Sequence, residues 1–424
     1  MAGIGIIGSG IAGLQLGLSL QQQGIAATIY AERTPEQELR RRLPNMVARN
    51  GCTRARERQL GVNHWDRPSH DMVRLAMTIR GARRLAFSGA MAPPAHAVDM
   101  RIYAARLLDD FSSRGGRVSI GTIQADQLDH LASQHDLLVV ASGRASLSTI
   151  FPRVAERSPF TRPQRLVIAG LFRGIAYSEP LALEVIVTPG SGEVLAVPVQ
   201  SFERGLTGIG ILVASGGLFE PLRHLRYDAS PRAFAAATLA FLRAHAPSIF
   251  ERADPRTFDL ARPLDLTYAA ITPTVRRGFV GLSNGRHAVA LGDAHVVIDP
   301  VTGQGANSAS HAAGVLAQAI LDAERFDRAF CERVEQDICS YVVPVSDAAN
   351  ARLQPPTPHF RELLTAAARD QAIADVYGDS FTHPDRFWAI ACKAERTAAF
   401  LIDVERRGTA SGGAWAPRAH QPTA

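Results

Sequence analysis

Residues 3–13 read Gly-Ile-Gly-Ile-Ile-Gly-Ser-Gly-Ile-Ala-Gly, and this stretch decides the fold. Its first five residues are mostly apolar, which predicts a short buried strand. Apolar side chains then recur at Ile11, Leu14 and Leu18, on one face of a predicted helix. A second strand is predicted over residues 26–30. Strand, tight turn, helix and strand in this order form a βαβ unit.

The turn inside this unit has the spacing G-x-G-x-x-G at Gly8, Gly10 and Gly13. Gly8 permits the tight turn, Gly10 lets the backbone approach a pyrophosphate, and Gly13 lets the helix pack closely on the strand. The helix start adds unpaired N–H groups that attract phosphate. Glu32 follows at the end of the second strand, where a carboxylate binds a ribose hydroxyl. The pattern predicts a dinucleotide site without separating FAD from NAD.

A second glycine-rich segment lies near residue 300. Gly292-Asp293-Ala294-His295 follows a predicted buried strand over 288–291, and Asp299-Pro300-Val301-Thr302-Gly303-Gln304-Gly305-Ala306-Asn307 opens a predicted helix. We interpret His295 as part of the turn and not as a catalytic base.

With these segments the chain resembles the glutathione-reductase-fold flavoprotein monooxygenases, in which such a segment holds the flavin end of FAD. The resemblance implies that Asp293 binds the ribityl chain and that the 303–307 turn directs backbone N–H groups at the pyrimidine side of the flavin. Reduced flavin carries negative charge there, and preorganised donors stabilise it. The implied cofactor is FAD, held by Gly8, Gly10, Gly13, Glu32, Asp293, Pro300, Gly303, Gly305, Ala306 and Asn307.

A third segment, residues 136–143, resembles the strand and A-T-G turn that these flavoproteins place near the cofactor. Single-component aromatic hydroxylases continue with an Asp-Gly pair associated with NAD(P)H use. Here Arg144-Ala145-Ser146 follows instead. The departure suggests that the chain does not reduce its own flavin.

The rest of the chain indicates an α/β fold of more than one domain. We expect a discontinuous Rossmann-type FAD-binding domain, an inserted β-sheet substrate domain with mostly antiparallel strands, and C-terminal helices. A hairpin is predicted over 72–87, around Gly81. The expected bounds are 1–40, 96–160 and 280–325 for the FAD domain, 41–95 and 161–279 for the substrate domain, 326–407 for the helices and 408–424 for a disordered tail.

The closest family resemblance is to the oxygenase component of two-component styrene and indole monooxygenases. It is carried by residues 3–13, 43–48, 97–103, 136–143 and 299–307. It implies that reduced FAD comes from a separate NAD(P)H-dependent flavin reductase. O2 is then trapped as a flavin C4a-hydroperoxide, and one oxygen atom passes to a small styrene- or indole-like aromatic substrate or to a sulfide. Such transfer needs a water-poor pocket and no side-chain nucleophile.

The same resemblance assigns site residues. Asn45 is implied at the reactive edge of the flavin, as the catalytic position, and Arg42 and Arg101 are implied to help hold the cofactor. Arg42 is equally well explained as a solvated member of the Arg40–Arg42 run. By the same resemblance, the family's substrate-selectivity positions fall on Asn45, Val47, Arg49, Met72, Leu75 and Ala95. Asn45 and Val47 match the styrene type, while Met72, Leu75 and Ala95 lean toward the indole type. Arg49 matches neither, and Met72 and Leu75 are alternatively core residues of the hairpin.

Composition argues against nucleic-acid binding, a membrane location and a metal site. The net charge is +6, but only one of the 46 basic residues is lysine and the arginines are scattered, so no nucleic-acid footprint is expected. No apolar run is long enough for a membrane span and no secretion signal precedes the first strand, so we expect a cytoplasmic protein. The four cysteines have no metal-ligand spacing; we expect free buried thiols and no metal. A homodimer is possible.

The sequence is compared with three alternative functions, of which a single-component NAD(P)H-dependent aromatic hydroxylase is the main one. A flavin-dependent halogenase is disfavoured because its lysine and paired tryptophans are missing: the only lysine is Lys393, and Trp65, Trp388 and Trp415 stand far apart. A non-catalytic FAD-fold protein is disfavoured by the presence of the 303–307 turn.

Overall fold

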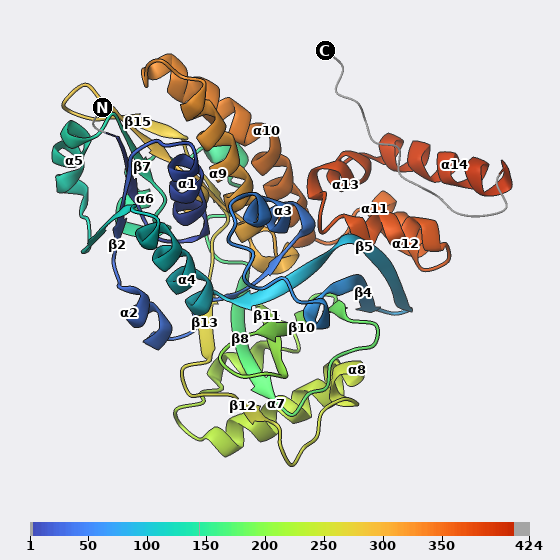
Figure 1. The fold of residues 1–424 in the computed structure, drawn as a ribbon. Helices are drawn as coiled ribbons and strands as arrows, with labels where there is room; N and C mark the ends of the chain where they lie inside the picture. The colour runs from blue at the N-terminus through green and yellow to red at the C-terminus, as the bar shows by residue number, and fades with distance from the viewer. Residues whose placement is uncertain (1–2, 144, 411–424) are drawn as a thin grey trace.

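The computed structural model describes residues 3–143 and 145–410. Arg144, Trp415 and residues 411–424 of the predicted tail lie outside the described residues. The part of that tail at 408–410 belongs to the last helix. Two sheets organise the molecule, one covered by helices and one extending below it in Figure 1.

The first sheet contains the predicted βαβ unit. In the described residues it has the order β15-β16-β7-β1-β2-β6, and every neighbouring pair is parallel except β15 with β16. The strands are β15 (Phe279–Gly281), β16 (His287–Ala290), β7 (Leu137–Val140), β1 (Ile4–Ile7), β2 (Ala27–Ala31) and β6 (Arg117–Ile120). This is a Rossmann-like core, because β1 lies between β2 and β7 and feeds α1 (Ile11–Gln22).

Different helices cover the two faces of this sheet. One face packs in a large apolar cluster with α1, α4 (Met100–Ser113), α9 (Gly305–Leu321) and α10 (Arg328–Arg352). The opposite face packs a smaller cluster with α5 (Leu128–Gln134), which lies at the left of Figure 1. The helix after residue 10 is buried on nearly all sides because α4 and α9 both pack against it.

The second sheet is larger and mixed. Its order is β12-β8-β11-β10-β9-β4-β5-β3, with β13 also paired to β8. The strands are β12 (Asp259–Leu260), β8 (Arg165–Arg173), β11 (Leu206–Ala214), β10 (Gly192–Gln200), β9 (Ala182–Thr188), β4 (Met72–Arg80), β5 (Arg84–Asp99), β3 (Met46–Arg49) and β13 (Leu266–Ala270). Most pairings are antiparallel, while β4–β9 and β10–β5 are parallel. Helices α7 (Pro231–His245) and α8 (Pro247–Phe250) pack beside this sheet.

The second strand of the predicted hairpin is longer than expected. It runs to Asp99 instead of ending near Phe87. Pro93 and Pro94 interrupt the strand pattern in the sequence, yet pairing with β4 resumes beyond them, because the extra residues form a bulge in β5 between Ala90 and Ala95. This extension pairs β5 with β3 at the edge of the same sheet and leads directly into α4, which packs on the first sheet.

The remaining elements complete the covering layers. They are α2 (Pro35–Arg40), α3 (Gly51–Gln59), α6 (Ala145–Ser148), the two-stranded pair β14 (Thr274–Val275) and β17 (Val296–Val297), and the C-terminal helices α11 (Pro358–Ala367), α12 (Gln371–Asp379), α13 (Pro384–Ala391) and α14 (Ala394–Ala410). Short 3-10 turns lie at 68–70, 125–127, 155–157, 220–224, 292–294 and 300–302. Among the described helices, not one combines the length and the apolar character that crossing a bilayer requires.

The cysteines are free, but the expectation that all are buried was wrong. Cys331 is buried, Cys339 and Cys392 are half-buried, and Cys52 is exposed. Cys52 is the second residue of α3 and is exposed, although its neighbours Gly51 and Thr53 are buried.

Candidate cofactor and substrate site

Of the three glycines in the turn after β1, two have no room for a side chain and the third has room. A Cβ on Gly8, which has φ +119°, would lie 2.8 Å from the carbonyl of Ala141, and a Cβ on Gly13 would lie 2.0 Å from the Gly8 carbonyl oxygen. A Cβ on Gly10 would meet nothing within 4 Å. The three glycines therefore have the three expected roles: a tight turn, close helix packing and an open approach to the backbone.

The start of α1 offers hydrogen-bond donors. The first bonded amide is that of Leu14, which donates to the Gly10 carbonyl (3.0 Å). The amides of Ile11, Ala12 and Gly13 have no acceptor in the described chain. Glu32 follows β2 directly and is half-exposed. A helix start with free N–H groups and a nearby carboxylate suits a phosphate joined to a ribose.

The G-D turn lies between the two glycine-rich helix starts. A Cβ on Gly292 (φ +60°) would lie 3.2 Å from Cβ of Ala12 in α1 and 3.5 Å from Cβ of Ala309 in α9. A Cβ on Gly143 would lie 2.7 Å from Cβ of Asp293. The segments around Ala12, Gly143 and Gly292, which are far apart in sequence, thus meet at the carboxyl ends of β1, β7 and β16.

Asp293 lies in the turn that follows β16, and its side chain is exposed to solvent. Desolvation by the surrounding protein raises the pKa of its carboxyl group, against the opposing charge of Arg276. Gly10 and Gly143 are also exposed.

The turn before α9 presents a second set of donors. Gly303 (φ +66°) ends the 300–302 turn, where Pro300 is the first residue. The first bonded amide of α9 is that of Ser308, which donates to the Gln304 carbonyl (2.9 Å). The amides of Gly305, Ala306 and Asn307 have no acceptor in the described chain. Backbone donors at this helix start can stabilise negative charge on a bound group.

The side chain of Asn307 has a different function, which is to tie the α9 start to β3 and α3. Its Nδ2 donates to the Ala48 carbonyl (3.1 Å) and to the Gly303 carbonyl (3.3 Å). Its Oδ1 accepts from the amide of Asn50 (3.0 Å) and from the hydroxyl of Thr53 (2.9 Å). Any contact of Asn307 with a cofactor is therefore left to its backbone N–H.

Asn45 and Arg42 lie on the loop that leads into β3, and both are exposed. The carbonyl of Asn45 accepts a long hydrogen bond from the amide of Met100 (3.5 Å). Arg42 donates to the Leu266 carbonyl (3.1 Å) and lies 3.8 Å from the Asp228 carboxylate. One guanidinium nitrogen of Arg42 thus bridges to β13.

Arg101 is fully buried at the start of α4. Its guanidinium donates to both oxygens of Asp99 and, through Nη2, to Asp265 (2.6 Å). Nη1 donates to the carbonyls of Arg41 (3.3 Å) and Leu264 (3.5 Å). These bonds engage every nitrogen of the guanidinium, so Arg101 acts on the loop before Asn45 through the Arg41 backbone.

The predicted selectivity positions divide between two places. Met72, Leu75 and Ala95 belong to one apolar cluster on the large sheet, where Met72 pairs with Ala95. Val47 packs instead in the cluster of the Rossmann-like core. Arg49 has no exposed surface and forms an ion pair with Glu57.

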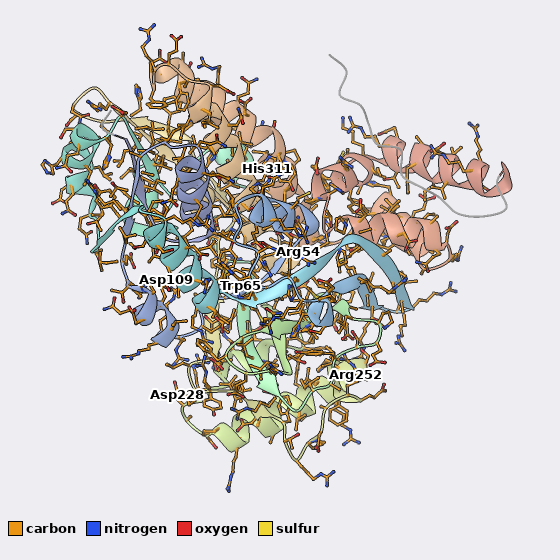
Figure 2. All side chains as sticks on the ribbon, viewed as in Figure 1. Arg54, Trp65, Asp109, Asp228, Arg252 and His311 are labelled. Carbon is orange, nitrogen blue, oxygen red and sulfur yellow. The ribbon has the colours of Figure 1, made fainter. Side chains whose placement is uncertain are left out.

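The Arg49–Glu57 pair lies beneath two aromatic rings. The guanidinium carbon of Arg49 is 5.4 Å from the centre of the Trp65 ring, and Trp65 stacks on Tyr103 at 4.9 Å; Figure 2 places Trp65 near the middle of the molecule. Arg49 also donates to Nδ1 of His96 (3.3 Å). Burial, together with the charge of Arg49, lowers the pKa of His96 to about 2, so this histidine is neutral.

Sequence reasoning missed a buried network that continues from Glu57. Glu57 accepts from Tyr103 (3.0 Å), whose hydroxyl accepts from Gln15 (2.9 Å). Gln15 in turn accepts from Ser310 (2.5 Å), which accepts from Arg56 (2.6 Å). The network joins α1, α3, α4 and α9, and no spacing along the chain signals it because each helix contributes one or two members.

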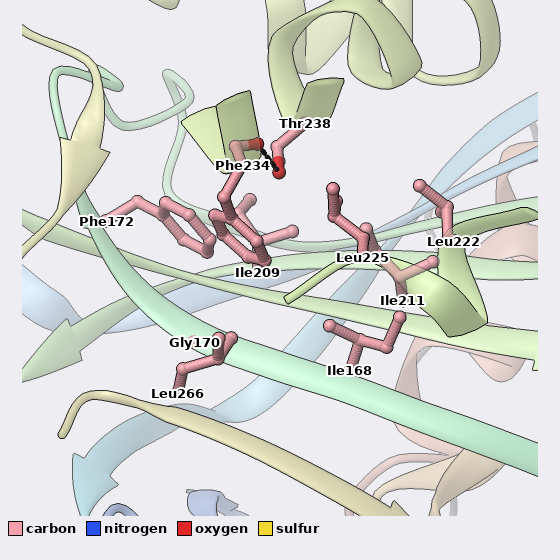
Figure 3. Close-up of a pocket in the computed structure, with 10 residues that line it drawn as sticks. All are labelled: Ile168, Gly170, Phe172, Ile209, Ile211, Leu222, Leu225, Phe234, Thr238 and Leu266. Carbon is pink, nitrogen blue, oxygen red and sulfur yellow. Dashed lines mark hydrogen bonds between the residues drawn. The ribbon is translucent and has the colours of Figure 1, made fainter. Parts of the chain in front are cut away.

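The cavity shown in Figure 3 lies away from this site. It is enclosed by apolar side chains of β8, β11, β13 and α7, and its volume is about 10 Å3. That is the space of about one water molecule, so it is a packing defect of the core and not a substrate pocket. Among the described residues, no group of three or more metal-ligating side chains has the geometry to hold an ion.

This fold and these donors define a class of protein, the FAD-binding oxidoreductases with a Rossmann-like core. Solved structures with the same fold include a flavin-dependent brominase (TM-score 0.63, 15% identity, 96% of this chain and 99% of that one). They also include the flavin-dependent halogenase CmlS (TM-score 0.64, 17% identity, 96% and 78% covered). A third is HpxO of Klebsiella pneumoniae complexed with FAD (TM-score 0.56, 18% identity, 89% and 98% covered). At these identities the likeness concerns the fold alone.

Sequence relatives narrow the class. Residues 143–252 match the family model described as the styrene monooxygenase A putative substrate binding domain. The styrene monooxygenase StyA of Pseudomonas fluorescens is 36% identical over 397 residues, which is 93% of this chain and 96% of that protein. StyA of a second Pseudomonas has the same identity and coverage. The chain belongs to the styrene monooxygenase family: it is a flavin monooxygenase, and its cofactor is FAD.

Proposed function

We propose that the chain is the oxygenase component of a two-component monooxygenase. It takes reduced FAD from a separate NAD(P)H-dependent flavin reductase and transfers one oxygen atom of O2 to a small styrene- or indole-like aromatic substrate. Reduced FAD, when bound, supplies the activated oxygen. Family membership supports the proposal, and so does the sequence Arg144-Ala145-Ser146 where NAD(P)H-using hydroxylases have an Asp-Gly pair.

One structural observation gives the proposal its main support: the side chain of Asn307 joins the 303–307 turn to β3. Through the bonds of Asn307 to Ala48 and Asn50, the start of α9 is held against the strand that follows Asn45. Met46 and Ala48 of that strand pack on the apolar cluster that contains Met72 and Ala95. A flavin held at the α9 start would lie near the strand that follows Asn45, and the family resemblance implies that Asn45 would face its reactive edge.

The residues have separate roles in this account. The amides at 11–13 bind pyrophosphate, Glu32 binds the ribose and Asp293 binds the ribityl chain. The amides at 305–307 would hold the flavin, Pro300 would shape the turn that precedes them, and Arg42 and Arg101 would fix the neighbouring loop. Asn45 orients the reacting group, and the apolar cluster excludes water, which favours oxygen transfer over loss of peroxide. Substrate recognition belongs to residues 41–95 and 161–279.

Although the resemblance leans Met72, Leu75 and Ala95 toward the indole type, their apolar side chains offer no acceptor for the N–H of indole and favour a hydrocarbon substrate. Arg49 is paired with Glu57 and faces Trp65 of the Rossmann-like core. We therefore expect styrene to be oxygenated faster than indole.

The test separates the electron source from the oxygen transfer. The purified chain with FAD is first mixed with NADH without oxygen, and flavin absorbance is followed. We expect no reduction within turnover times. Reduced FAD from an unrelated flavin reductase, with 18O2 and styrene, indole or a thioether, is then expected to give a product that contains one labelled oxygen.

Either half of the experiment can contradict the proposal. Rapid reduction by NADH alone would make the chain a single-component hydroxylase. Consumption of reduced FAD with peroxide as the only product, for all three substrates, would remove this substrate class.

A further inference from the structure

A second, separate groove lies on the face of the parallel sheet opposite α1. Its volume is about 480 Å3, within the range of small-molecule sites. It lies between β2, β6 and α5. The lining residues are Thr28, Tyr30, Arg117, Ser119, His130, Leu131, Gln134 and His135.

The register between β2 and β6 shows which side chains form the floor of this groove. Thr28 pairs with Arg117 and Tyr30 pairs with Ser119 between the parallel strands β2 and β6. Side chains alternate along a strand, and the intervening Ile29 and Ala31 pack in the cluster with α1. The four polar side chains therefore share the face that α5 only partly covers.

These side chains leave hydrogen-bonding capacity unused. In residues 3–143 and 145–410, the side chains of Thr28, Arg117 and Ser119 make no hydrogen bond, and Arg117 makes no ion pair. The hydroxyl of Tyr30 bonds Nε2 of His135 (2.8 Å). When His135 donates in that bond, the phenolic hydrogen of Tyr30 is free to point into the groove.

The charge of the groove is positive. Arg117 is exposed, and His130 lies on the opposite wall. Two acids that flank this wall in sequence are engaged elsewhere: Asp129 accepts from the amide (2.9 Å) and the hydroxyl (2.6 Å) of Ser283, and Asp136 accepts from the amide of Gly3 (3.1 Å). An unpaired guanidinium among hydroxyl groups is suited to an anion with several oxygen acceptors.

The FAD residues lie elsewhere. The phosphate turn and α1 belong to the other face of the sheet, and Glu32 follows the end of β2. The groove is also larger than an inorganic anion needs, and Leu131 with the Tyr30 ring gives it an apolar side.

We propose that this groove binds a small phosphate ester. The phosphate accepts hydrogen bonds from Arg117, Ser119 and Thr28, and the organic part lies along Leu131 and the Tyr30 ring. This site is independent of the oxygenase function proposed above.

The test is isothermal titration calorimetry on the FAD-loaded protein in phosphate-free buffer, so that the cofactor site is already filled. AMP and glycerol phosphate are expected to bind, inorganic phosphate more weakly, and uncharged adenosine not at all. Arg117→Gln is expected to weaken AMP binding by roughly 10- to 100-fold, which corresponds to one lost charge-assisted contact. Arg84→Gln, an exposed arginine on the distant β5, is the matched control and is expected to leave AMP binding unchanged.

Amide hydrogen exchange locates the site. AMP is expected to protect residues 27–31 and 117–120 in the wild type and not in Arg117→Gln. Absence of binding by both esters, equal affinity of wild type and Arg117→Gln, equal affinity for AMP and adenosine, or protection confined to other segments would each overturn the proposal. None of these outcomes depends on whether the chain oxygenates styrene.

Discussion

Replacement of Glu57 by leucine is expected to lower the free energy of unfolding by about 3–5 kcal/mol, the usual cost of removing one partner of a buried ion pair. Arg49 would remain as a charged group without exposed surface, and the hydroxyl of Tyr103 would lose its acceptor. Burial raises the pKa of the Glu57 carboxyl group, while the charge of Arg49 opposes that rise. Each buried charge is therefore stabilised by its partner. Urea unfolding of the FAD-free protein measures the change.

Two variants make this result specific. Glu203→Gln removes one partner of the exposed Arg173–Glu203 pair and is expected to cost less than about 1 kcal/mol. The double variant Arg49→Met with Glu57→Leu is expected to recover much of the loss, because no unpaired charge remains buried. A Glu57→Leu protein as stable as Glu203→Gln would show that the pair does not hold β3 against α3.

Replacement of Gly10 by alanine is expected to weaken FAD binding by about 100-fold, or about 2.7 kcal/mol, while leaving the stability of the FAD-free protein nearly unchanged. A methyl group there would meet no protein atom within 4 Å, and the backbone of Gly10 (φ −80°) suits alanine. The methyl group would instead stand where a pyrophosphate must approach the helix start. Fluorescence titration with FAD measures the affinity.

Gly281→Ala is the matched control, since a Cβ at this position also meets nothing within 4 Å but the residue ends an edge strand. It is expected to bind FAD like the wild type. Equal FAD affinity in Gly10→Ala and Gly281→Ala would mean that the pyrophosphate does not approach the turn at Gly10.

Most of the fold could be predicted from local sequence patterns. The βαβ unit around Gly8–Gly13 and the strand and helix around Gly292 and Gly305 follow from apolar spacing and glycine position, which act within a few residues. The length of β5 could not be predicted, because Pro93 and Pro94 interrupt its pattern and lie in a bulge beyond which pairing resumes.

The sequence predicted those parts of the site that lie within one short motif. It did not predict the parts that are assembled from several elements. The backbone donors at 305–307 are a property of one helix start. The ties of the Asn307 side chain and the path from Arg49 through Tyr103 to Ser310 arise only when α1, α3, α4 and α9 pack together. Resemblance placed Arg49 at a selectivity position, and its burial against Glu57 became visible only in three dimensions.

The central claim is that two distant glycine-rich helix starts hold opposite ends of one FAD molecule. A crystal structure of the FAD complex measures this most directly. We expect the pyrophosphate within hydrogen-bonding distance of the amides at 11–13 and a pyrimidine oxygen of the same molecule within that distance of the amides at 305–307. An FAD whose flavin lies away from residues 303–307, or whose pyrophosphate lies away from residues 8–13, would contradict the account.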